Sequence, residues 1–380
     1  MGFSYPDLGS KTMPLERLDI SHVRNLSSVR FEPSPQVNLI VGANGSGKTS
    51  VLEAIYLLSF GRSFRSHKHK TYIQYDNEAC LIFAQLAQAD GRTARVGLQR
   101  HRDGQIDVRI QGQRAQSVLE LAERLPVQLI NPDAFRLLEG SPSIRRQFID
   151  WGVFHFDLEF ISAWRGWQKA LKQRNTLLRR GKITASLLSA FDQELIRLGE
   201  QVNLSRKAYV DKLTPLFHQV LSLLTQALKV ELSFYQGWDA QKSLQMAIEA
   251  GRERDIELGY THSGPQRADL RVKTTTGDAL DTLSRGQQKL VVSALKIAQG
   301  QLLIDMGRPL VFLVDDLPAE LDAQHRQKLC QLLESLNSQI FITSVEPDTT
   351  DFTWADSTDV RQFVMQQGEL SSLSKGLQES

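Results

Sequence analysis

The spacing of hydrophobic residues changes twice along the chain. The first third contains short apolar or alternating runs that are typical of strands, with Asp90-Gly91 and Asp103-Gly104 as turns between the later runs. From about residue 156 to residue 228, apolar residues recur at helical spacing, and Thr214-Pro215 predicts the start of a further helix. Strand-like runs then return. The predicted strands are residues 15–20, 37–41, 81–87, 94–100, 106–111, 230–235, 269–273, 310–314 and 339–343.

A glycine-rich octet lies between the predicted strand at residues 37–41 and a helical stretch at residues 50–58. It is the P-loop pattern in the strand–loop–helix context that this pattern requires, and its glycines allow backbone N–H groups to converge on a phosphate. A chance glycine-rich turn would not carry this context. We therefore expect Lys48 to contact the β- and γ-phosphates of ATP and Thr49 to ligate Mg²⁺. The octet is Gly42, Ala43, Asn44, Gly45, Ser46, Gly47, Lys48 and Thr49.

Two acidic residues follow the apolar run at residues 310–314, as in a Walker B segment. Beside a P-loop, Asp315 is predicted to support Mg²⁺. Asp316 takes the position at which many such ATPases carry a glutamate that polarises the attacking water, so it is the candidate catalytic residue, although its side chain is one methylene shorter. An apolar strand that simply meets a turn is the alternative explanation.

A third motif, Leu283-Ser284-Arg285-Gly286-Gln287-Gln288, precedes a helical stretch at residues 289–299. It is similar to the LSxGQ signature of ABC ATPases. In that superfamily the signature serine and the helix N-terminus bind the γ-phosphate held by the partner subunit, so that ATP is sandwiched in a dimer. The resemblance thus implies an ATP-dependent homodimer. The nucleotide ligands it implies are Ser284, Arg285, Gly286, Gln287 and, in a segment that resembles the D-loop, Asp322.

Longer segments resemble one branch of this superfamily. Residues 47–66 read GKTSVLEAIYLLSFGRSFRS and residues 261–269 read THSGPQRAD, and both are similar to segments of the RecF family of SMC-like ABC ATPases. The interval between the P-loop and the signature is longer than in transporter subunits and much shorter than in SMC or Rad50 proteins. The resemblance extends from Leu15 to about Gly368.

The family implies an α/β fold with two lobes. One is a P-loop NTPase head lobe of the ABC and SMC-head type with an antiparallel β layer, and the other is a mainly helical lobe with a short arm. Met13 is a second plausible start of the chain. The expected parts are a loose extension at residues 1–12, the head lobe at residues 13–130 and 255–380, and the helical lobe at residues 131–254.

The resemblance also implies a function, that of an ATP-dependent DNA-binding protein of recombinational repair and replication restart. It implies a dimer on duplex DNA near single-strand gaps, which helps RecO and RecR to load RecA in the SOS response. The family's early Arg-Asn pair corresponds to Arg24 and Asn25, which are expected near the nucleotide. A transporter-type Q-loop glutamine has no clear counterpart and Thr343-Ser344 replace the switch histidine, so we expect slow, DNA-stimulated ATP hydrolysis that resets the dimer.

Two other hypotheses follow from the motifs alone. A transporter-energising subunit would bind a membrane protein, and the long interval and the GRSFR segment speak against it. A monomeric P-loop NTPase that acts on a small molecule would leave the signature segment unexplained. Co-purification and ATP-dependent dimerisation would separate these classes.

The net charge of +2 does not itself indicate a nucleic-acid partner, which local basic clusters would have to bind. Two clusters are candidates for contacting the phosphates of duplex or gapped DNA, and a solvated basic face is the alternative for each. The cluster residues are Arg65, Lys68 and Lys70 around Phe64, and Arg179, Arg180 and Lys182 at the predicted tip of the arm.

Cysteine usage and hydropathy indicate in which cellular compartment the protein is expected. Cys80 and Cys330 are far apart and lack metal-ligand spacing, which favours reduced thiols in a cytoplasmic protein over a disulfide framework or a structural metal. The apolar run at residues 290–314 is interrupted by Lys296, Asp305 and Arg308, so we expect no membrane span.

Overall fold

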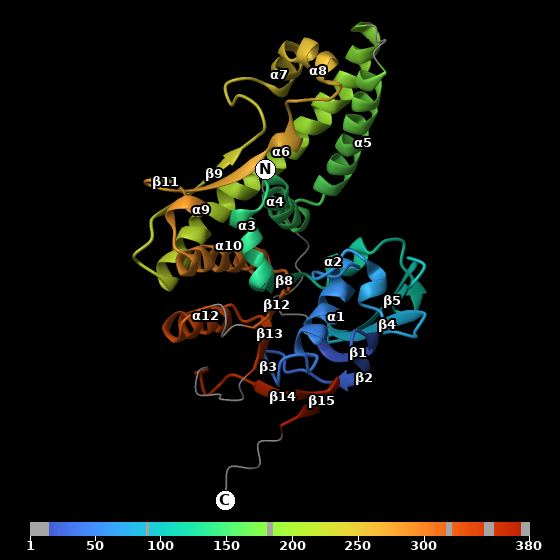
Figure 1. The fold of residues 1–380 in the computed structure, drawn as a ribbon, viewed down its shortest axis with the longest axis vertical. Helices are drawn as coiled ribbons and strands as arrows, with labels where there is room; N and C mark the ends of the chain where they lie inside the picture. The colour runs from blue at the N-terminus through green and yellow to red at the C-terminus, as the bar shows by residue number, and fades with distance from the viewer. Residues whose placement is uncertain (1–14, 89–90, 181–184, 317–320, 346–352, 374–380) are drawn as a thin grey trace, which may run out of the picture. The chain divides into compact units, whose positions relative to one another are not determined.

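The contacts within the chain divide it into two compact units (Figure 1). We call Met1–Ala134 together with Gly300–Ser380 the P-loop unit, and Phe135–Gln299 the helical unit. The expected loose extension at residues 1–12 lies outside the described residues, as does Lys182. The computed structural model describes residues 15–88, 91–180, 185–316, 321–345 and 353–373.

The boundary between the units differs from the expected one. The expected return to the head lobe lies near residue 255, whereas residues 255–299 pack within the helical unit. The reason is strand pairing, because β10 (Asp269–Thr274) pairs antiparallel with β9 (Val230–Tyr235) of the helical unit. The apolar spacing predicts both strands but does not reveal which neighbour each strand takes.

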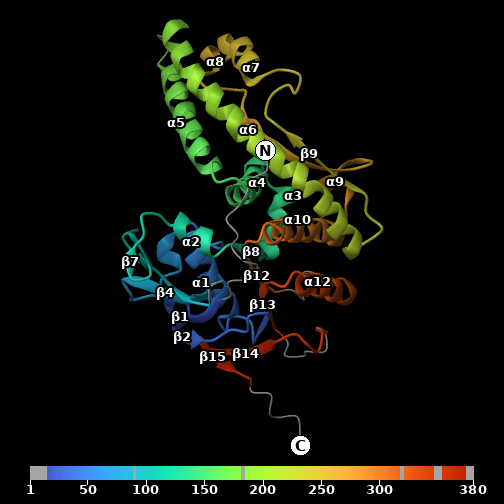
Figure 2. The same ribbon diagram turned by 180° about the vertical axis from the view of Figure 1, so that it is seen from behind.

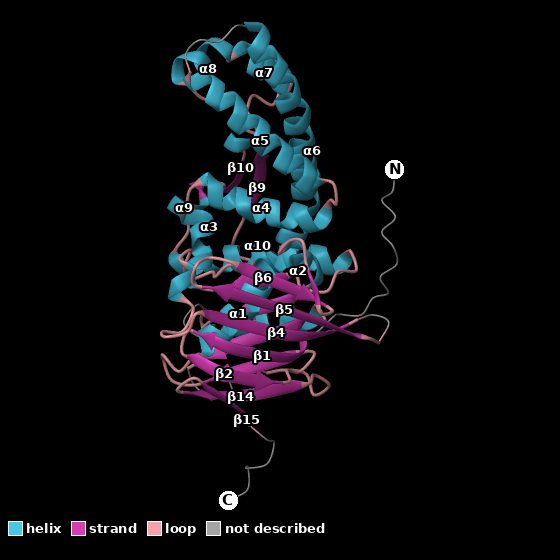
Figure 3. Ribbon diagram, turned by 90° about the vertical axis from the view of Figure 1, so that its right-hand side faces the viewer, coloured by secondary structure: helices cyan, strands magenta, loops and turns pink. Residues whose placement is uncertain are grey.

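The first sheet of the P-loop unit is antiparallel throughout, in the order β2-β1-β4-β5-β6-β7 (Figure 3). Its long strands alternate buried and more exposed residues, as expected when one face packs on a core and the other faces solvent. The predicted antiparallel layer is therefore confirmed. The strands are β1 Leu15–Val23, β2 Leu26–Phe31, β4 Ala79–Ala87, β5 Thr93–His101, β6 Ile106–Ile110 and β7 Gln113–Arg114.

The second sheet has the order β15-β14-β3-β13-β12-β8 and is parallel except for its edge strand β15. Four of its strands, β3, β8, β12 and β13, are buried along their whole length, which explains why their sequences are mostly apolar and do not alternate with polar residues. Because the carboxyl ends of parallel strands share one edge, the segments that follow β3 and β12 meet there. The strands are β3 Val37–Val41, β8 Val127–Ile130, β12 Val311–Val314, β13 Gln339–Ser344, β14 Val360–Gln366 and β15 Glu369–Ser372.

Helix α1 (Lys48–Phe60) connects the two sheets. It packs against β1, β4 and β5 of the antiparallel sheet and against β13 of the second sheet, so residues on most sides of the helix are buried. A helix buried on most sides is expected to be largely apolar, which matches residues 51–58 apart from Glu53. The other helices of this unit are η1 His69–Thr71, α2 Leu119–Arg124, η2 Pro132–Phe135 and α12 Ala323–Ser335.

Two long helices, α5 (Phe160–Arg179) and α6 (Ala185–Leu224), pack against each other in the helical unit (Figure 1, Figure 2). Pro215 lies inside α6, so the helix start predicted at Thr214-Pro215 is wrong. Leu213 and Phe217 are buried on either side of the proline, and this packing outweighs the loss of one backbone donor. The remaining elements are α3 Arg136–Glu139, α4 Pro142–Phe156, α7 Leu244–Ala250, α8 Arg252–Leu258, η3 Pro265–Arg267, β11 Gly277–Asp278, α9 Ala279–Thr282 and α10 Arg285–Asp305.

None of the helices in the described part of the chain combines the length and the hydropathy that crossing a membrane requires.

A buried ionic cluster joins the arm helices to α8. The Arg174 guanidinium is fully buried and donates to Asp192 at 2.6 Å, to Asp255 at 2.6 Å and to the Thr261 hydroxyl at 2.7 Å. Arg252 also lies 3.0 Å from Asp192, and His262 contacts Asp255. Such a cluster stabilises the fold as a set, because removing its central cation leaves two buried carboxylates with fewer partners.

Arg174→Met should lower the free energy of unfolding by about 3–5 kcal/mol, because Asp192 and Asp255 would lose their shared cation. Urea denaturation followed by circular dichroism measures this value. The matched control is Arg197→Met, which removes an exposed arginine paired with Glu194 and should cost less than about 1 kcal/mol. Similar losses in the two variants would contradict the assignment of the cluster.

Candidate nucleotide-binding site

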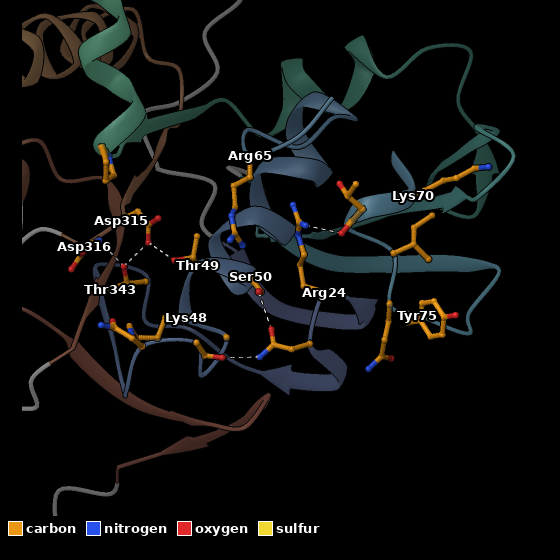
Figure 4. Close-up of a pocket in the computed structure, with 18 of the residues that line it drawn as sticks. Arg24, Lys48, Thr49, Ser50, Arg65, Lys70, Tyr75, Asp315, Asp316 and Thr343 are labelled. Atoms are coloured by element: carbon orange, nitrogen blue, oxygen red, sulfur yellow. Dashed lines mark hydrogen bonds between the residues drawn. The ribbon is translucent and has the colours of Figure 1, made fainter. Parts of the chain in front are cut away.

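The P-loop connects the end of β3 to the start of α1 (Figure 4). Two of its glycines have positive φ and no space for a side chain. A Cβ on Gly42 would lie 2.3 Å from the carbonyl oxygen of Met365, and one on Gly47 would lie 2.9 Å from Leu26 Cδ2. The loop thus approaches β14 and β2 as closely as glycine permits. The amino end of α1, whose first N–H groups lack helical partners, opens at this loop.

Lys48 folds back over the loop. Its Nζ donates hydrogen bonds to the carbonyl oxygens of Gly42 at 2.7 Å and Ala43 at 3.0 Å. Burial lowers the pKa of Lys48, and the negative charges of Asp316 and Asp315 oppose this shift. A phosphate oxygen at the loop would be a stronger acceptor for the ammonium group than these carbonyls, because charge-assisted hydrogen bonds are the stronger kind.

Asp315, directly after β12, links α1 to the second sheet. Its Oδ1 accepts hydrogen bonds from the hydroxyls of Thr49 at 2.9 Å and Thr343 at 2.8 Å (Figure 4). Burial raises the pKa of Asp315, and the two hydroxyl donors counteract this shift by stabilising the carboxylate. The two residues predicted to ligate Mg²⁺, Thr49 and Asp315, are therefore in direct contact.

Asp316 is the next residue and adopts a φ of 53°, in the left-handed region. Its backbone N–H donates to Thr343 Oγ1 at 2.8 Å, so one threonine contacts both acidic residues. Thr343 stands where many ABC ATPases carry a switch histidine. A non-glycine residue in this conformation needs support from its surroundings, and the Thr343 hydroxyl provides it here.

A second buried carboxylate organises the opposite wall of the site. Glu53, on α1, is fully buried and accepts two hydrogen bonds from Arg24, at 2.9 and 2.8 Å. Arg65 lies 3.5 Å from the same carboxylate, and the Ser63 hydroxyl donates to it. In the sequence, Glu53 is the one acidic residue of the helical stretch at residues 50–58, and this was the signal that could have revealed the cluster.

Asn25 fastens the β1–β2 hairpin to the P-loop. Its Nδ2 donates to the carbonyl oxygen of Ser46 at 3.0 Å, and its Oδ1 accepts from the Ser50 hydroxyl at 3.0 Å. The Ser46 hydroxyl is buried and has no hydrogen-bond partner among the described residues. Buried polar atoms usually have a partner, so an anion bound at the loop would explain this one.

The nucleotide site contains a cavity of about 690 Å³, which only some of these residues line. Two residues predicted to contact DNA, Arg65 and Lys70, line this cavity. Lys68, the third residue of that predicted cluster, does not line it. The predicted nucleotide ligands that line the cavity are Arg24, Asn25, Asn44, Gly45, Gly47, Lys48, Thr49, Asp315 and Asp316.

The far wall of the cavity is formed by Gln74, Tyr75 and Arg102, which the sequence did not predict as site residues. Arg102 holds this segment by donating to the carbonyl oxygens of Gln74 at 2.9 Å and Asn77 at 2.5 Å. The Tyr75 side chain is 82% exposed and lies on the side of the cavity away from Lys48 (Figure 4). No motif marks these residues, because the antiparallel sheet brings them to the cavity from separate segments.

The signature segment lies in the helical unit, at the amino end of α10. The Ser284 hydroxyl accepts from the Gln287 N–H at 3.4 Å, and the Gln287 side chain accepts from the Ser284 N–H at 2.9 Å, which is a capping box. Arg285 pairs with Glu139. Ser284, Arg285 and Gly286 are exposed, so the first turn of a long helix is open to an anion.

Asp322 caps α12. One of its carboxylate oxygens accepts from the His325 N–H at 2.9 Å, and the other lies 2.7 Å from His325 Nδ1. The hydrogen bonds from His325 lower the pKa of Asp322. The segment before it, which resembles the D-loop, lies mostly outside the described residues.

The predicted basic cluster at the tip of the arm is described in part. Arg179 and Arg180 are exposed at the end of α5, and Lys182 is outside the described residues. DNA contact by this cluster stays a prediction.

Comparison with known proteins identifies the family. Residues 14–370 match the model of the RecF/RecN/SMC N terminal domain. The chain is 88% identical to the DNA replication and repair protein RecF of Marinomonas sp. (strain MWYL1), over 97% of this chain and all of that protein. The chain belongs to the RecF family. A relative of the same name from Pseudomonas fluorescens (strain SBW25) is 49% identical over 94% of this chain and 98% of the relative.

Solved structures agree with this assignment. The structure of the recombination mediator protein RecF-ATPrS in the RecFOR pathway has a TM-score of 0.84 and 25% identity, and the match covers 97% of this chain and all of that chain. A second structure, of RecF-ATP in the same pathway, has the same TM-score and 24% identity. An Smc head domain from Pyrococcus furiosus shares the fold, with a TM-score of 0.58. The predicted RecF-like fold is confirmed, in preference to a transporter subunit or a monomeric P-loop NTPase.

Asp315→Asn should stabilise the ligand-free protein at neutral pH. Burial raises the pKa of Asp315, so the folded protein binds this proton more tightly than the unfolded chain does. The stability due to this group is therefore present at low pH and is lost as pH rises through the window between the ordinary and the raised pKa. Asparagine keeps an acceptor for Thr49 and Thr343 without the buried charge.

Urea denaturation of both proteins at neutral pH, and again below the ordinary pKa of aspartate, tests this prediction. The difference in free energy of unfolding should be present at neutral pH and small in acid. Asp356→Asn, at an exposed carboxylate of the same unit, should show no such difference. A gain in the Asp315→Asn protein that is the same at both pH values would contradict the burial argument.

Proposed function

We propose that this chain is an ATP-dependent DNA-binding protein of recombinational repair, in which Mg-ATP bound at the P-loop pairs two copies of the chain on DNA. The observation that carries the proposal is the 2.9 Å hydrogen bond between Thr49 and Asp315. It joins the two halves of a nucleotide site that are more than half the chain apart in sequence. Membership of the RecF family and the solved structures of RecF with ATP and with ATPrS support the proposal.

The oxygen donors at the loop fit Mg²⁺. Thr49 offers a hydroxyl and Asp315 a carboxylate, and hard oxygen ligands of this kind bind magnesium together with water and phosphate oxygens. Bound there, the ion would neutralise charge on the β- and γ-phosphates. Lys48 would bind the same phosphates, and the buried Ser46 hydroxyl would gain its missing partner.

Weak, DNA-stimulated hydrolysis would reset the switch. Asp316 lines the cavity, and Thr343 fixes its backbone, so it is the candidate to accept a proton from the attacking water. The Asp316 side chain is shorter than that of glutamate, and Thr343 stands in place of a switch histidine. These two features favour slow ATP hydrolysis, as expected for a protein whose proposed active state is the ATP-bound dimer.

The second half of the site would come from the other copy. Ser284 and Gly286 stand at the exposed start of α10, where backbone N–H groups and the helix dipole favour a negatively charged ligand. Because the segment resembles the ABC signature, the γ-phosphate of a nucleotide bound to a second chain is the ligand we assign to these residues.

The DNA would be duplex next to a single-strand gap, and RecO and RecR would be the proteins with which the chain helps to load RecA in the SOS response. Support comes from the family and from a solved relative that is described as part of the RecFOR pathway. We assign Arg65 and Lys70 to the nucleotide cavity instead of DNA. Lys68, Arg179 and Arg180 stay candidates for phosphate contacts.

The molar mass in solution, measured by light scattering with and without Mg-ATP and a gapped duplex, tests the dimer. Wild type should change from one chain to two only with ATP, and the dimer should bind the DNA more tightly. Ser284→Arg should bind ATP and stay monomeric. Lys48→Met should bind ATP about 10-fold to 100-fold more weakly, because a hydrogen bond to a charged group contributes about 1.5–3 kcal/mol.

A wild-type protein that stays monomeric with ATP and does not bind DNA would contradict the proposed ATP-dependent pairing of two chains on DNA. Dimerisation of Ser284→Arg at the wild-type ATP concentration would show that the signature segment is not part of the interface.

Tyr75 should contribute to binding of the adenine base. It lies at the end of the cavity away from the P-loop, and an exposed aromatic ring can stack on a base. Tyr75→Ala should weaken ATP binding by about 5-fold to 100-fold, because base stacking on an aromatic side chain contributes about 1–3 kcal/mol. Titration calorimetry with ATP measures the loss, and Tyr75→Phe should keep the wild-type affinity.

Tripolyphosphate has no base and is the matched ligand for this test. It should bind Tyr75→Ala and wild type equally well. An equal loss for ATP and tripolyphosphate would show that Tyr75 supports the loop and does not contact the base.

A further inference from the structure

The outer face of the antiparallel sheet in the P-loop unit is rich in arginine. Helix α1 packs on the other face of this sheet, and Figure 3 shows the strands of the sheet in front of α1. The alternation of buried and exposed residues along each strand identifies the outward positions. The charged side chains on this face include Arg17, Asp19, Arg30, Arg95, Asp107, Arg109 and Arg114. Two further carboxylates lie near it: Glu16, which accepts a hydrogen bond from the Thr93 hydroxyl at 3.0 Å, and Glu32, whose charge acts on Arg17.

Strand register arranges these side chains in rows across the sheet. One row crosses all six strands, and a second row lies next to it on three of them. Neighbouring strands are about 4.7–4.9 Å apart, so the long arginine side chains of both rows can reach a ligand that lies across the strands. The first row is Arg30, Asp19, Phe83, Gly97, Arg109 and Arg114, and the second is Arg17, Gln85 and Arg95.

The centre of the face is hollow. Gly97 has no side chain at the point where its neighbours project outward, and the hollow lined by these strands has a volume of about 600 Å³. Phe83 and Leu81 give it an apolar lining, and Leu81 is 45% exposed although it is a large hydrophobic residue. The volume is within the range of about 300–1,000 Å³ that is typical of small-ligand sites.

Two of the five arginines have no acidic partner. Arg95 and Arg109 line the hollow, and neither forms an ion pair with any described carboxylate. Their charges are therefore available to a ligand. The other three pair with Asp19 and Asp107: Asp19 lies 2.9 Å from Arg17 and 2.7 Å from Arg30, and Asp107 lies 3.1 Å from Arg114 and 3.3 Å from His101.

We propose that this face binds a segment of single-stranded DNA, with one base in the hollow against Phe83 and the adjoining phosphates on Arg95 and Arg109. A planar guanidinium binds phosphate with two parallel hydrogen bonds, and an aromatic ring accepts the flat face of any base. A duplex keeps its bases stacked inside and would leave the apolar lining of the hollow unused. An acidic protein segment would match the arginines but has no planar group for Phe83.

The inference rests on the proposed DNA-binding function and adds to it. The proposed function has the chain on duplex DNA near a gap, and this face would hold the unpaired strand of the same substrate. Because the face lies apart from the P-loop cavity, on residues that do not line it, the two can be tested separately.

The test measures binding of a labelled single-stranded oligonucleotide to the full chain by fluorescence anisotropy, without nucleotide and over a range of salt concentrations. Arg95→Ala with Arg109→Ala should weaken binding at least tenfold. It should also reduce the slope of log K against log salt by about 1.4, since each lost phosphate contact on a single strand changes it by about 0.7. Phe83→Leu should weaken binding and reduce the quenching of a 2-aminopurine base in the oligonucleotide, with the salt slope unchanged.

The matched control, Lys212→Ala with Arg254→Ala, removes two exposed cations from the helical unit and should leave affinity and slope at wild-type values. Unchanged single-strand binding by the Arg95 and Arg109 variant would overturn the proposal. The proposal would also be overturned if this variant lost affinity for a fully paired duplex to the same extent, or lost affinity only for an acidic peptide such as polyglutamate. If wild type fails to dimerise with ATP but the variants show the expected losses of single-strand binding, the result would count against the proposed function alone.

Discussion

One carboxylate oxygen holds the nucleotide site together. Asp315 Oδ1 accepts hydrogen bonds from the hydroxyls of Thr49 at the start of α1 and of Thr343 on β13, while Asp315 itself follows β12. Three elements that are far apart in sequence thus meet at a single acceptor. Because burial disfavours the charged form of this carboxylate, the two donors do more than position it: they help to keep it ionised. The junction fixes the start of α1, where the phosphate loop ends, to the second sheet.

Helix α1 carries a second junction of the same kind on its other side. Glu53 is fully buried and satisfied by Arg24, Arg65 and Ser63, so the helix is fixed to both sheets by hydrogen-bonded carboxylates as well as by apolar packing. Unpartnered buried charges would cost several kcal/mol each, and satisfied ones give the helix a single orientation. A P-loop at the amino end of such a helix presents its N–H groups in a fixed direction.

The parts of this structure that depend on neighbours in sequence could be predicted, and those that depend on long-range pairing could not. The P-loop and the acidic end of β12 follow from short patterns in the sequence. The extent of the helical unit does not, because it depends on the pairing of β10 with β9. The continuation of α6 through Pro215 depends on tertiary packing. Arg65 and Lys70 look like a surface cluster in the sequence, and only the fold turns them into the cavity.

The capping box at α10 has a chemical consequence for the signature serine. The Ser284 oxygen accepts the Gln287 N–H through a lone pair, which leaves its own proton unused. The hydroxyl rotor is thereby biased to point away from the helix, so the group that ends the helix is also an oriented donor for an incoming oxygen. An alanine there would remove the cap and the donor at once, whereas a threonine would keep both and add only a methyl group.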